Sequence, residues 1–277
     1  MEEHKNDMKT LTFRAIVLAV IFLVMAAVVL CWLGRDTVFA WFASNKSVKS
    51  NGMTVDCTDG ALELGRLIKI VPSVGSRDFE ALYYMADENG GYYQVTTDNS
   101  VAESELAGEI NGDKYYFVKS NGNYIPINFT GLFPGEKLTI TLSFTNTTSE
   151  QLPYRLALED FDDKDNGTFE IPEGDGNTPG TYSVMGVFFA KLEAINGVAS
   201  DSEGGFLSSY DTENGKSTNL ESFEVASGFI DAGATVECVF SISVNLQQYR
   251  TLRGVYANLL SKKRFTVGSL RLSVKDN

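Results

Sequence analysis

The stretch that decides the fold class is LTITLSF at residues 138–144, in which apolar and hydroxyl-bearing side chains alternate. Alternation with a period of two is typical of a β-strand with one buried face, because successive side chains of a strand point to opposite sides. The run TVECVFSISV at residues 235–244 repeats the pattern. We therefore predict two half-buried strands, with Leu138, Ile140, Leu142 and Phe144 facing inward on the first and Cys238 facing inward on the second.

Short strands and tight turns are predicted through most of the chain after residue 50. ALYYMADENGGYYQV (residues 81–95) and KYYFVKSNGNYIPIN (residues 114–128) each predict a hairpin with Gly and Asn at the turn. FTVGSLRLSV (residues 265–274) predicts a last strand, and residues 160–180 and 196–222 are expected to be long surface loops. This organisation indicates an all-β domain, an antiparallel β-sandwich or jelly roll, over residues 51–277.

One segment has helical rather than strand spacing. LQQYRTLRGVYANLLSKK, residues 246–263, places apolar side chains three or four residues apart. We predict one amphipathic helix, inserted before the last strand.

The N-terminal region contains an uninterrupted apolar run. AIVLAVIFLVMAAVVLCWL, residues 15–33, has 19 residues without a charge, and as a helix it would be about 28 Å long, close to the thickness of a bilayer core. Lys9 and Arg14 precede it, so residues 1–14 are expected in the cytoplasm and the remainder of the chain outside. The run is therefore predicted to be a transmembrane or signal helix.

Residues 34–50 are predicted to be a linker that carries a candidate signal cleavage site. The small residue Ala40 follows Val38 and Phe39, so a cut before Trp41 would satisfy the side-chain preferences of a signal peptidase. Without cleavage the chain is a single-pass membrane protein, anchored through residues 15–33. With cleavage it is secreted or held at the cell surface.

Composition narrows the classes of function. The net charge is -13, and an acidic domain repels the phosphate backbone, so no nucleic-acid partner is expected. The only histidine is His4, upstream of the apolar run, so a Ser–His–Asp triad is excluded in the exported part. We expect no enzyme activity, no cofactor, no metal and no catalytic or cofactor-binding residue. A hydrolase that uses carboxylates alone is kept as an alternative, because glycosidases need only a pair of Asp or Glu side chains.

Two cysteines lie on the apolar faces of predicted strands, Cys57 in MTVDC and Cys238 in TVECVFSISV. An exported location permits a disulfide between them. Two buried free thiols are the alternative. Cys31 lies inside the apolar run and is interpreted as a small hydrophobic residue.

Two further features have both a functional and a structural interpretation. DFDDKDNGTFE, residues 160–170, offers oxygen ligands for calcium but does not match the EF-hand register, so a solvated acidic loop is the alternative. In each tyrosine doublet we expect one ring to face the core and the other to face outward, because side chains alternate along a strand. The outward ring could stack on sugars or pack on a partner, or could simply stabilise the sheet across strands. The doublets are Tyr83 with Tyr84, Tyr92 with Tyr93, and Tyr115 with Tyr116.

Three stretches together resemble a known family. They are AWFASNKSVKSNGMTV (residues 40–55), LFPGEKLTITLSFTNTTSEQLPYRLAL (residues 132–158) and IDAGATVECVFSISV (residues 230–244). They look like the TasA and camelysin surface and biofilm-matrix proteins of Gram-positive bacteria, which carry a SipW-dependent type of signal segment.

The resemblance implies export through a dedicated signal peptidase and a mature jelly roll with an aromatic pair, here Trp41 and Phe42, just after the cleavage site. It also implies that an extended N-terminal segment starting at Trp41 is lent to a neighbouring subunit. Camelysin has been labelled a metallopeptidase, but this chain has no HExxH motif, so no protease activity is carried over.

The sequence therefore predicts a non-enzymatic cell-surface or extracellular-matrix protein that acts through protein–protein interaction and assembles into oligomers or fibres. Its expected partners are the membrane, a signal peptidase, other surface proteins and further copies of itself. The alternative is a membrane-anchored extracellular module that binds a glycan or a protein.

Overall fold

The computed structural model describes residues 54–57, 60–86, 92–98, 100–118, 127–130, 132–162, 167–171, 180–211, 216–249, 260 and 263–275. The chain divides into two units, residues 1–48 and 49–277, and all described residues belong to the second. The predicted cytoplasmic segment (1–14), apolar helix (15–33) and linker (34–50, with Ala40 and Trp41) lie outside the described residues. Within the described part, no helix has the length and hydropathy needed to cross a membrane.

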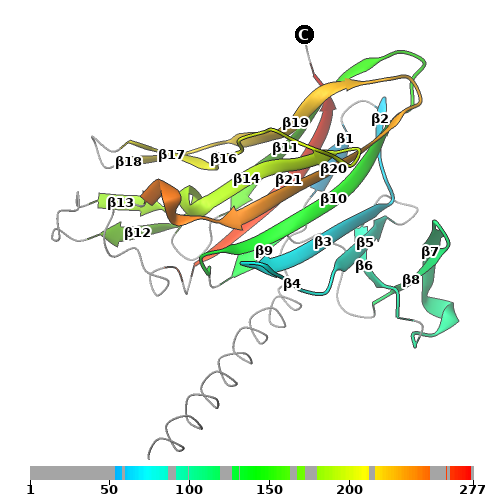
Figure 1. The fold of residues 1–277 in the computed structure, drawn as a ribbon, viewed down its shortest axis with the longest axis horizontal. Coiled ribbons are helices and arrows are strands. Elements are labelled where there is room, and N and C mark those ends of the chain that lie inside the picture. The colour runs from blue at the N-terminus through cyan, green and yellow to red at the C-terminus, as the bar shows by residue number, and fades with distance from the viewer. Residues whose placement is uncertain are drawn as a thin grey trace, which may run out of the picture. The chain divides into compact units, whose positions relative to one another are not determined.

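The described residues form an all-β structure built on two sheets, in which every strand pair but one is antiparallel (Figure 1). The first, sheet A, has the strand order β1 (Thr54–Cys57), β21 (Arg264–Val274), β11 (Leu152–Asp162) and β19 (Ser222–Ile230), with β9 (Ile127–Thr130) also paired to β21. The all-β prediction is confirmed at this level.

Sheet B is larger and contains both strands that the alternating pattern predicted. Its order is β15 (Val198–Ala199), β14 (Phe188–Ile195), β20 (Thr235–Val244), β10 (Glu136–Asn146), β3 (Leu67–Val74), β5 (Leu82–Ala86), β6 (Tyr92–Thr96), β8 (Asp113–Phe117) and β7 (Leu106–Ile110). Three short strands pair beside this path, β2 (Leu62–Leu64) with β10, β4 (Arg77–Asp78) with β3 and β16 (Gly205–Phe206) with β14.

Part of the region expected to be surface loop is instead paired. Two hairpins stand apart from the main sheets, β12 (Thr168–Ile171) with β13 (Gly180–Ser183) and β17 (Ser208–Asp211) with β18 (Lys216–Asn219). The loop prediction for 160–180 and 196–222 was therefore wrong at these strands. Their polar composition hides the strand pattern, although Phe169 stacks on Tyr182 with ring centroids 5.7 Å apart.

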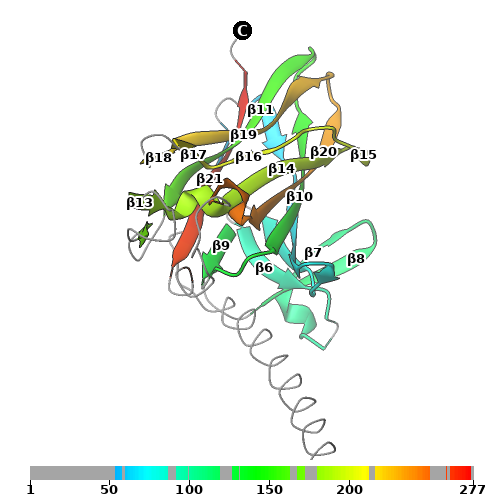
Figure 2. The same ribbon diagram turned by 60° about the vertical axis from the view of Figure 1, so that its left-hand side comes forward.

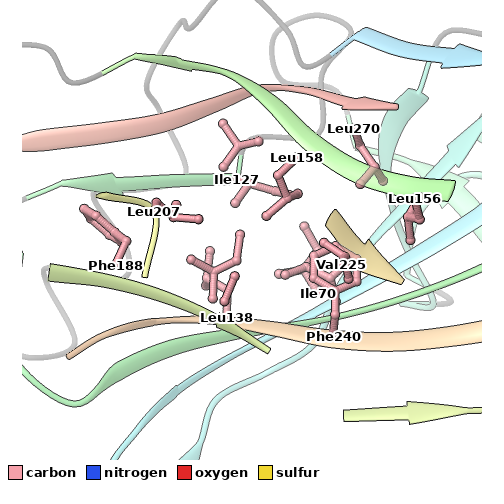
Figure 3. Packing of buried hydrophobic residues seen from close by; sticks show 14 of the residues in the cluster. Ile70, Ile127, Leu138, Leu156, Leu158, Phe188, Leu207, Val225, Phe240 and Leu270 are labelled. Atoms are coloured by element: carbon pink, nitrogen blue, oxygen red, sulfur yellow. The ribbon is translucent and has the colours of Figure 1, made fainter. Parts of the chain in front are cut away.

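The inner faces of sheets A and B share one hydrophobic core (Figure 3). The inward row of β10 is buried along its whole length, from Leu138 to Phe144, as the alternation predicted. In β20 the row that contains Cys238 and Phe240 faces the same core. Sheet A contributes Leu158 and Leu270, among others. Each of the two sheets therefore buries one face in this shared core.

The chain repeatedly crosses between the sheets: β10 lies in sheet B, β11 in A, β14 in B, β19 in A, β20 in B and β21 in A. Asn146, fully buried at the end of β10, joins two of these crossings. Its Nδ2 donates to the carbonyl oxygens of Glu150 (2.7 Å), Ile230 (3.1 Å) and Asp231 (3.2 Å). Its Oδ1 accepts from the amide (2.9 Å) and hydroxyl (2.8 Å) of Thr148. One side chain thus fixes both the β10–β11 and the β19–β20 connections.

The segment predicted as an amphipathic helix starts differently from the prediction. Leu246–Tyr249 (η4) is a short 3₁₀ turn, and no helix of seven or more residues occurs in the described part of the chain. The amide of Gln247 donates to Asn245 Oδ1 (2.8 Å), a side-chain bond that begins the turn directly after β20. The central part of the predicted helix, residues 250–259, lies outside the described residues.

Candidate interaction surface

The outward face of sheet A carries a network of charged side chains. Strand alternation directs Leu156 and Leu158 of β11 into the core and therefore directs Arg155, Ala157 and Glu159 outward. Ala157 is nevertheless fully buried. The charged side chains around it are long enough to cover a small neighbour with their apolar stems.

Two carboxylates hold the network together. Glu159 pairs with Arg155 Nη1 (3.4 Å) and with Arg271 Nη1 (3.5 Å). Glu224 pairs with Arg155 Nε (3.4 Å) and Lys275 Nζ (3.4 Å). The network therefore links β19, β11 and β21 through alternating charges.

The Glu224 carboxylate is also bound by a hydroxyl. Ser227 Oγ donates to Glu224 Oε1 at 2.6 Å, and this hydrogen bond, followed by the charges of Lys275 and Arg155, lowers the pKa of Glu224 from its ordinary value. The negative charge of Glu224 is thus kept at neutral pH.

An exposed aromatic ring lies at one end of this face. Phe229 of β19 is 68% exposed and is paired in register with Pro153 of β11. The backbone directly after β21 is bonded to the same proline, because the amide of Lys275 donates to the Pro153 carbonyl (3.0 Å). A large apolar side chain beside positioned charges is the usual composition of a protein–protein contact.

Strand β19 is also an edge of sheet A, since within the described residues it pairs with β11 alone. The pairing is irregular between Leu156 and Ala157, where the unpaired residue of β19 is Val225. A bulge of this kind restricts strand addition, because it interrupts the row of edge hydrogen-bonding groups. The regular stretch beyond it, Ala226 to Ile230, holds no charge and includes Phe229. We define the β19 surface as this stretch together with Pro153.

The opposite edge of sheet A is shared by two strands. β1 pairs with Ser269–Leu272 of β21 in parallel, and every other strand pair in the described part is antiparallel. β9 pairs with the preceding stretch of the same edge, from Arg264 to Val267. The beginning of the predicted extracellular domain is thus part of the sheet, as expected for the segment that contains Val55.

The tyrosine doublets lie in β5, β6 and β8 of sheet B, and Figure 2 shows β6 and β8 near the β7 end of this sheet. The alternation prediction is confirmed for the first two doublets, in which Tyr84 and Tyr92 are buried and their neighbours Tyr83 and Tyr93 are partly exposed. It was wrong for the third, because both of its rings are buried.

The partly exposed rings already have partners within the sheet. Tyr83 meets Tyr115 edge to face (centroids 5.7 Å apart), and Tyr93 meets Phe117 in the same way (5.7 Å). Tyr115 belongs to a second small core with Met85 and Val95. The rings therefore stabilise the sheet across strands, the structural one of the two interpretations.

In its described part, the acidic segment 160–170 shows no arrangement of side chains suited to binding a metal ion. Asp160 and Asp162 close β11, and residues 163–166 lie outside the described residues. No group of three or more His, Cys, Asp or Glu side chains suited to a metal is found where the structure is described. Asp160 has a left-handed backbone (φ 53°), and its carbonyl lies against Gly268 of β21.

The two cysteines are on different sheets. Cys57 ends β1 in sheet A, where its backbone pairs with Leu272, whereas Cys238 lies in β20 of sheet B. Cys238 is fully buried and has no disulfide partner among the described residues, and burial raises the pKa of its thiol to about 12. The side chain of Cys57 lies outside the described part, so the disulfide stays a prediction.

Sequence reasoning missed three residues of interest: Glu136, Asn146 and Phe229. A signal existed for the first two. Both have the same parity as Leu138 and Phe144, so the alternation that predicted an inward row also places a carboxyl and an amide at its two ends. Phe229 has no comparable signal, because the exposure of an apolar residue depends on which elements cover it.

Comparisons of the chain with protein-family models, with curated proteins and with solved structures find no match. The resemblance to TasA and camelysin therefore stays a prediction from the sequence.

Proposed function

We propose that this chain is an exported, non-enzymatic protein of the cell surface or extracellular matrix that works by binding other proteins, including further copies of itself. We further propose that its two sheets form a β-sandwich of the jelly-roll type, as in the TasA and camelysin proteins that it resembles. The β19 surface is the observation that supports interaction most directly. It combines a strand edge with no partner among the described strands, a 68% exposed Phe229 and adjoining ordered charges.

Strand addition is the mode of interaction that this surface favours. An extended segment placed beside Ala226–Ile230 would complete the edge hydrogen bonds, and Phe229 would supply apolar contact area. By resemblance, the added segment is the N-terminal one of a neighbouring copy, beginning at Trp41. The uncharged edge limits electrostatic repulsion between two chains that each carry a charge of -13.

The first experiment addresses export. N-terminal sequencing of the protein recovered from the cell surface or medium should yield a chain that starts at Trp41. A chain that still starts at Met1 would favour the membrane-anchored binding module instead.

The second experiment addresses assembly. Sedimentation and electron microscopy of the exported form, over a range of concentrations, should show oligomers or fibres that are lost when residues 41–50 are deleted. Phe229→Ser should weaken this association at least tenfold. Val198→Ser is the matched control, because Val198 is 71% exposed but lies in β15 at the edge of sheet B. Equal effects of the two substitutions, or a monomer at every concentration, would contradict the assignment of the β19 surface.

A further inference from the structure

A carboxyl group is buried at the end of the inward row of β10. Glu136 is the first residue of this strand, and its parity directs the side chain toward the core, where it is 1% exposed. Its Oε2 accepts a hydrogen bond from the amide of Phe133 at 3.3 Å. No cation among the described residues pairs with it. A buried carboxyl group without a counter-charge is unusual in a core, because its ionised form is strongly disfavoured there.

Residues Phe133 to Glu136 form a tight turn. Pro134 and Gly135 are the central residues, Gly135 has φ 85°, and the Glu136 amide donates to the Phe133 carbonyl (3.1 Å). Proline followed by a residue of positive φ is characteristic of a type II turn. The hydrogen bond from the Phe133 amide to the Glu136 carboxyl group is therefore a second hydrogen bond that closes the same four-residue turn.

This turn is tied to both of its neighbours. The Gly135 amide donates to the carbonyl of Val244 at the end of β20 (3.0 Å), and its carbonyl accepts from the amide of Gly75 at the end of β3 (3.1 Å). Leu132 before the turn is buried, whereas Phe133 is 52% exposed. The closed turn thus holds an exposed aromatic ring in a defined place at the end of sheet B.

Among the described neighbouring elements, no charged group neutralises Glu136. Arg77 of β4 is the nearest cation by register, since it is paired with Val74, the partner of Glu136, but its guanidinium lies over the ring of Phe79. Asp78, the next residue of β4, is paired with Ser73 and not with Val74, so its side chain is directed to the other face of the sheet from that of Arg77. The 3₁₀ turn η4 contains no charged residue.

The next residue of β10 is directed away from the carboxyl group. Lys137 points to the outward face, where it pairs with Glu193 (3.6 Å). Desolvation is therefore the largest effect on the carboxyl group and raises the pKa of Glu136 to about 8, although the hydrogen bond from the Phe133 amide lowers this pKa.

We propose that Glu136 and the Phe133–Glu136 turn form a pH-sensitive latch, which is closed while the carboxyl group is protonated and opens when it ionises. Ionisation makes the buried position costly, and hydration of the carboxylate requires the turn to move away from the core. The bonds of Gly135 to Val244 and Gly75 then break, and the Phe133 ring loses its fixed position. The latch does not depend on the β19 surface, which is at the edge of sheet A.

Hydrogen exchange of the full-length chain in detergent tests the latch. The peptide that covers residues 132–138 is followed by mass spectrometry at pH 6.5, 8 and 9.5, with each rate divided by that of the same peptide from the unfolded protein. We expect protection in the wild type to fall at least tenfold between the first and last pH, with a midpoint near 8. Glu136→Gln should keep its protection, because glutamine cannot ionise. Glu237→Gln, an exposed acid on β20, is the matched control and should behave as the wild type.

Two results would overturn the latch. The first is constant protection of this peptide in the wild type. The second is an equal loss of protection in Glu136→Gln, which would assign the change to another group. If Glu136→Gln does not fold, Glu136→Met takes its place, since it has a similar size and no ionisable group. The wild-type measurement alone still overturns the proposal when it shows no pH dependence.

Discussion

Asn146 allows the sharpest test of what holds the fold together. It is fully buried, and its amide group makes the five hydrogen bonds that join the β10–β11 and β19–β20 connections. In Asn146→Ala the carbonyl oxygens of Glu150, Ile230 and Asp231 lose their shared donor. The amide and hydroxyl of Thr148 lose their acceptor.

The magnitude follows from these contacts. A neutral hydrogen bond contributes about 1 kcal/mol net, and a buried group left without a partner costs about 1–3 kcal/mol. The bond to Ile230 is buried, whereas the other four are partly accessible to water, which can replace part of the lost interaction. We therefore expect Asn146→Ala to lower the free energy of unfolding by about 3–5 kcal/mol.

Urea unfolding of the full-length chain in detergent, followed by circular dichroism, measures this change. Asn245→Ala is the control, because the Asn245 side chain accepts one hydrogen bond, from the Gln247 amide, and its loss should cost about 1 kcal/mol. Asn146→Asp should also be destabilised at neutral pH, because it places a carboxylate against three carbonyl oxygens, and it should recover in part as the pH falls. A loss below about 1 kcal/mol in Asn146→Ala would refute the role assigned to this side chain.

Three further predictions follow from the buried groups and the strand contacts. Burial raises the pKa of Glu136 from 4.5 to about 8, so the unfolded chain releases this proton at lower pH than the folded chain and the free energy of unfolding falls as the pH rises between these values. The expected loss is about 1.4 kcal/mol per pH unit and about 5 kcal/mol in all. Unfolding of Glu136→Gln measured across pH 4–9 should lack this pH-dependent loss. In Gly268→Ala the added carbon would lie 2.5 Å from the Asp160 carbonyl oxygen, so β11 and β21 must separate. We expect the free energy of unfolding to fall by about 1–3 kcal/mol in the same urea assay. An unchanged urea midpoint would contradict the close contact. The Cys238 thiol should resist alkylation in the folded protein at pH 8 and react only after unfolding, because burial raises its pKa to about 12; rapid labelling of Cys238 in the native state, located by peptide mapping, would contradict its burial.

The strands could be predicted from local sequence because their signal is local. In β10 apolar and hydroxyl-bearing residues alternate from Leu138 to Phe144, and in β20 only Val239 interrupts the alternation. A period of two is sufficient to assign a strand and its buried face. The same parity extends to Glu136 and Asn146, which the predicted inward row did not include. What the pattern could not supply is the depth of burial at those positions, since it depends on strands distant in sequence, such as β3 and β19.

The sequence by itself therefore determined the all-β class, the inward row of β10 and the acidic, histidine-poor character of the domain after the apolar run. Only the tertiary structure decided which strands are neighbours: β1 lies parallel to β21, more than 200 residues later in the chain, and Ala157 is buried beneath charges from three strands. The physical reason is that alternation is a property of adjacent residues. Pairing, edge exposure and the desolvation of Glu136 arise from contacts that form only when distant segments meet.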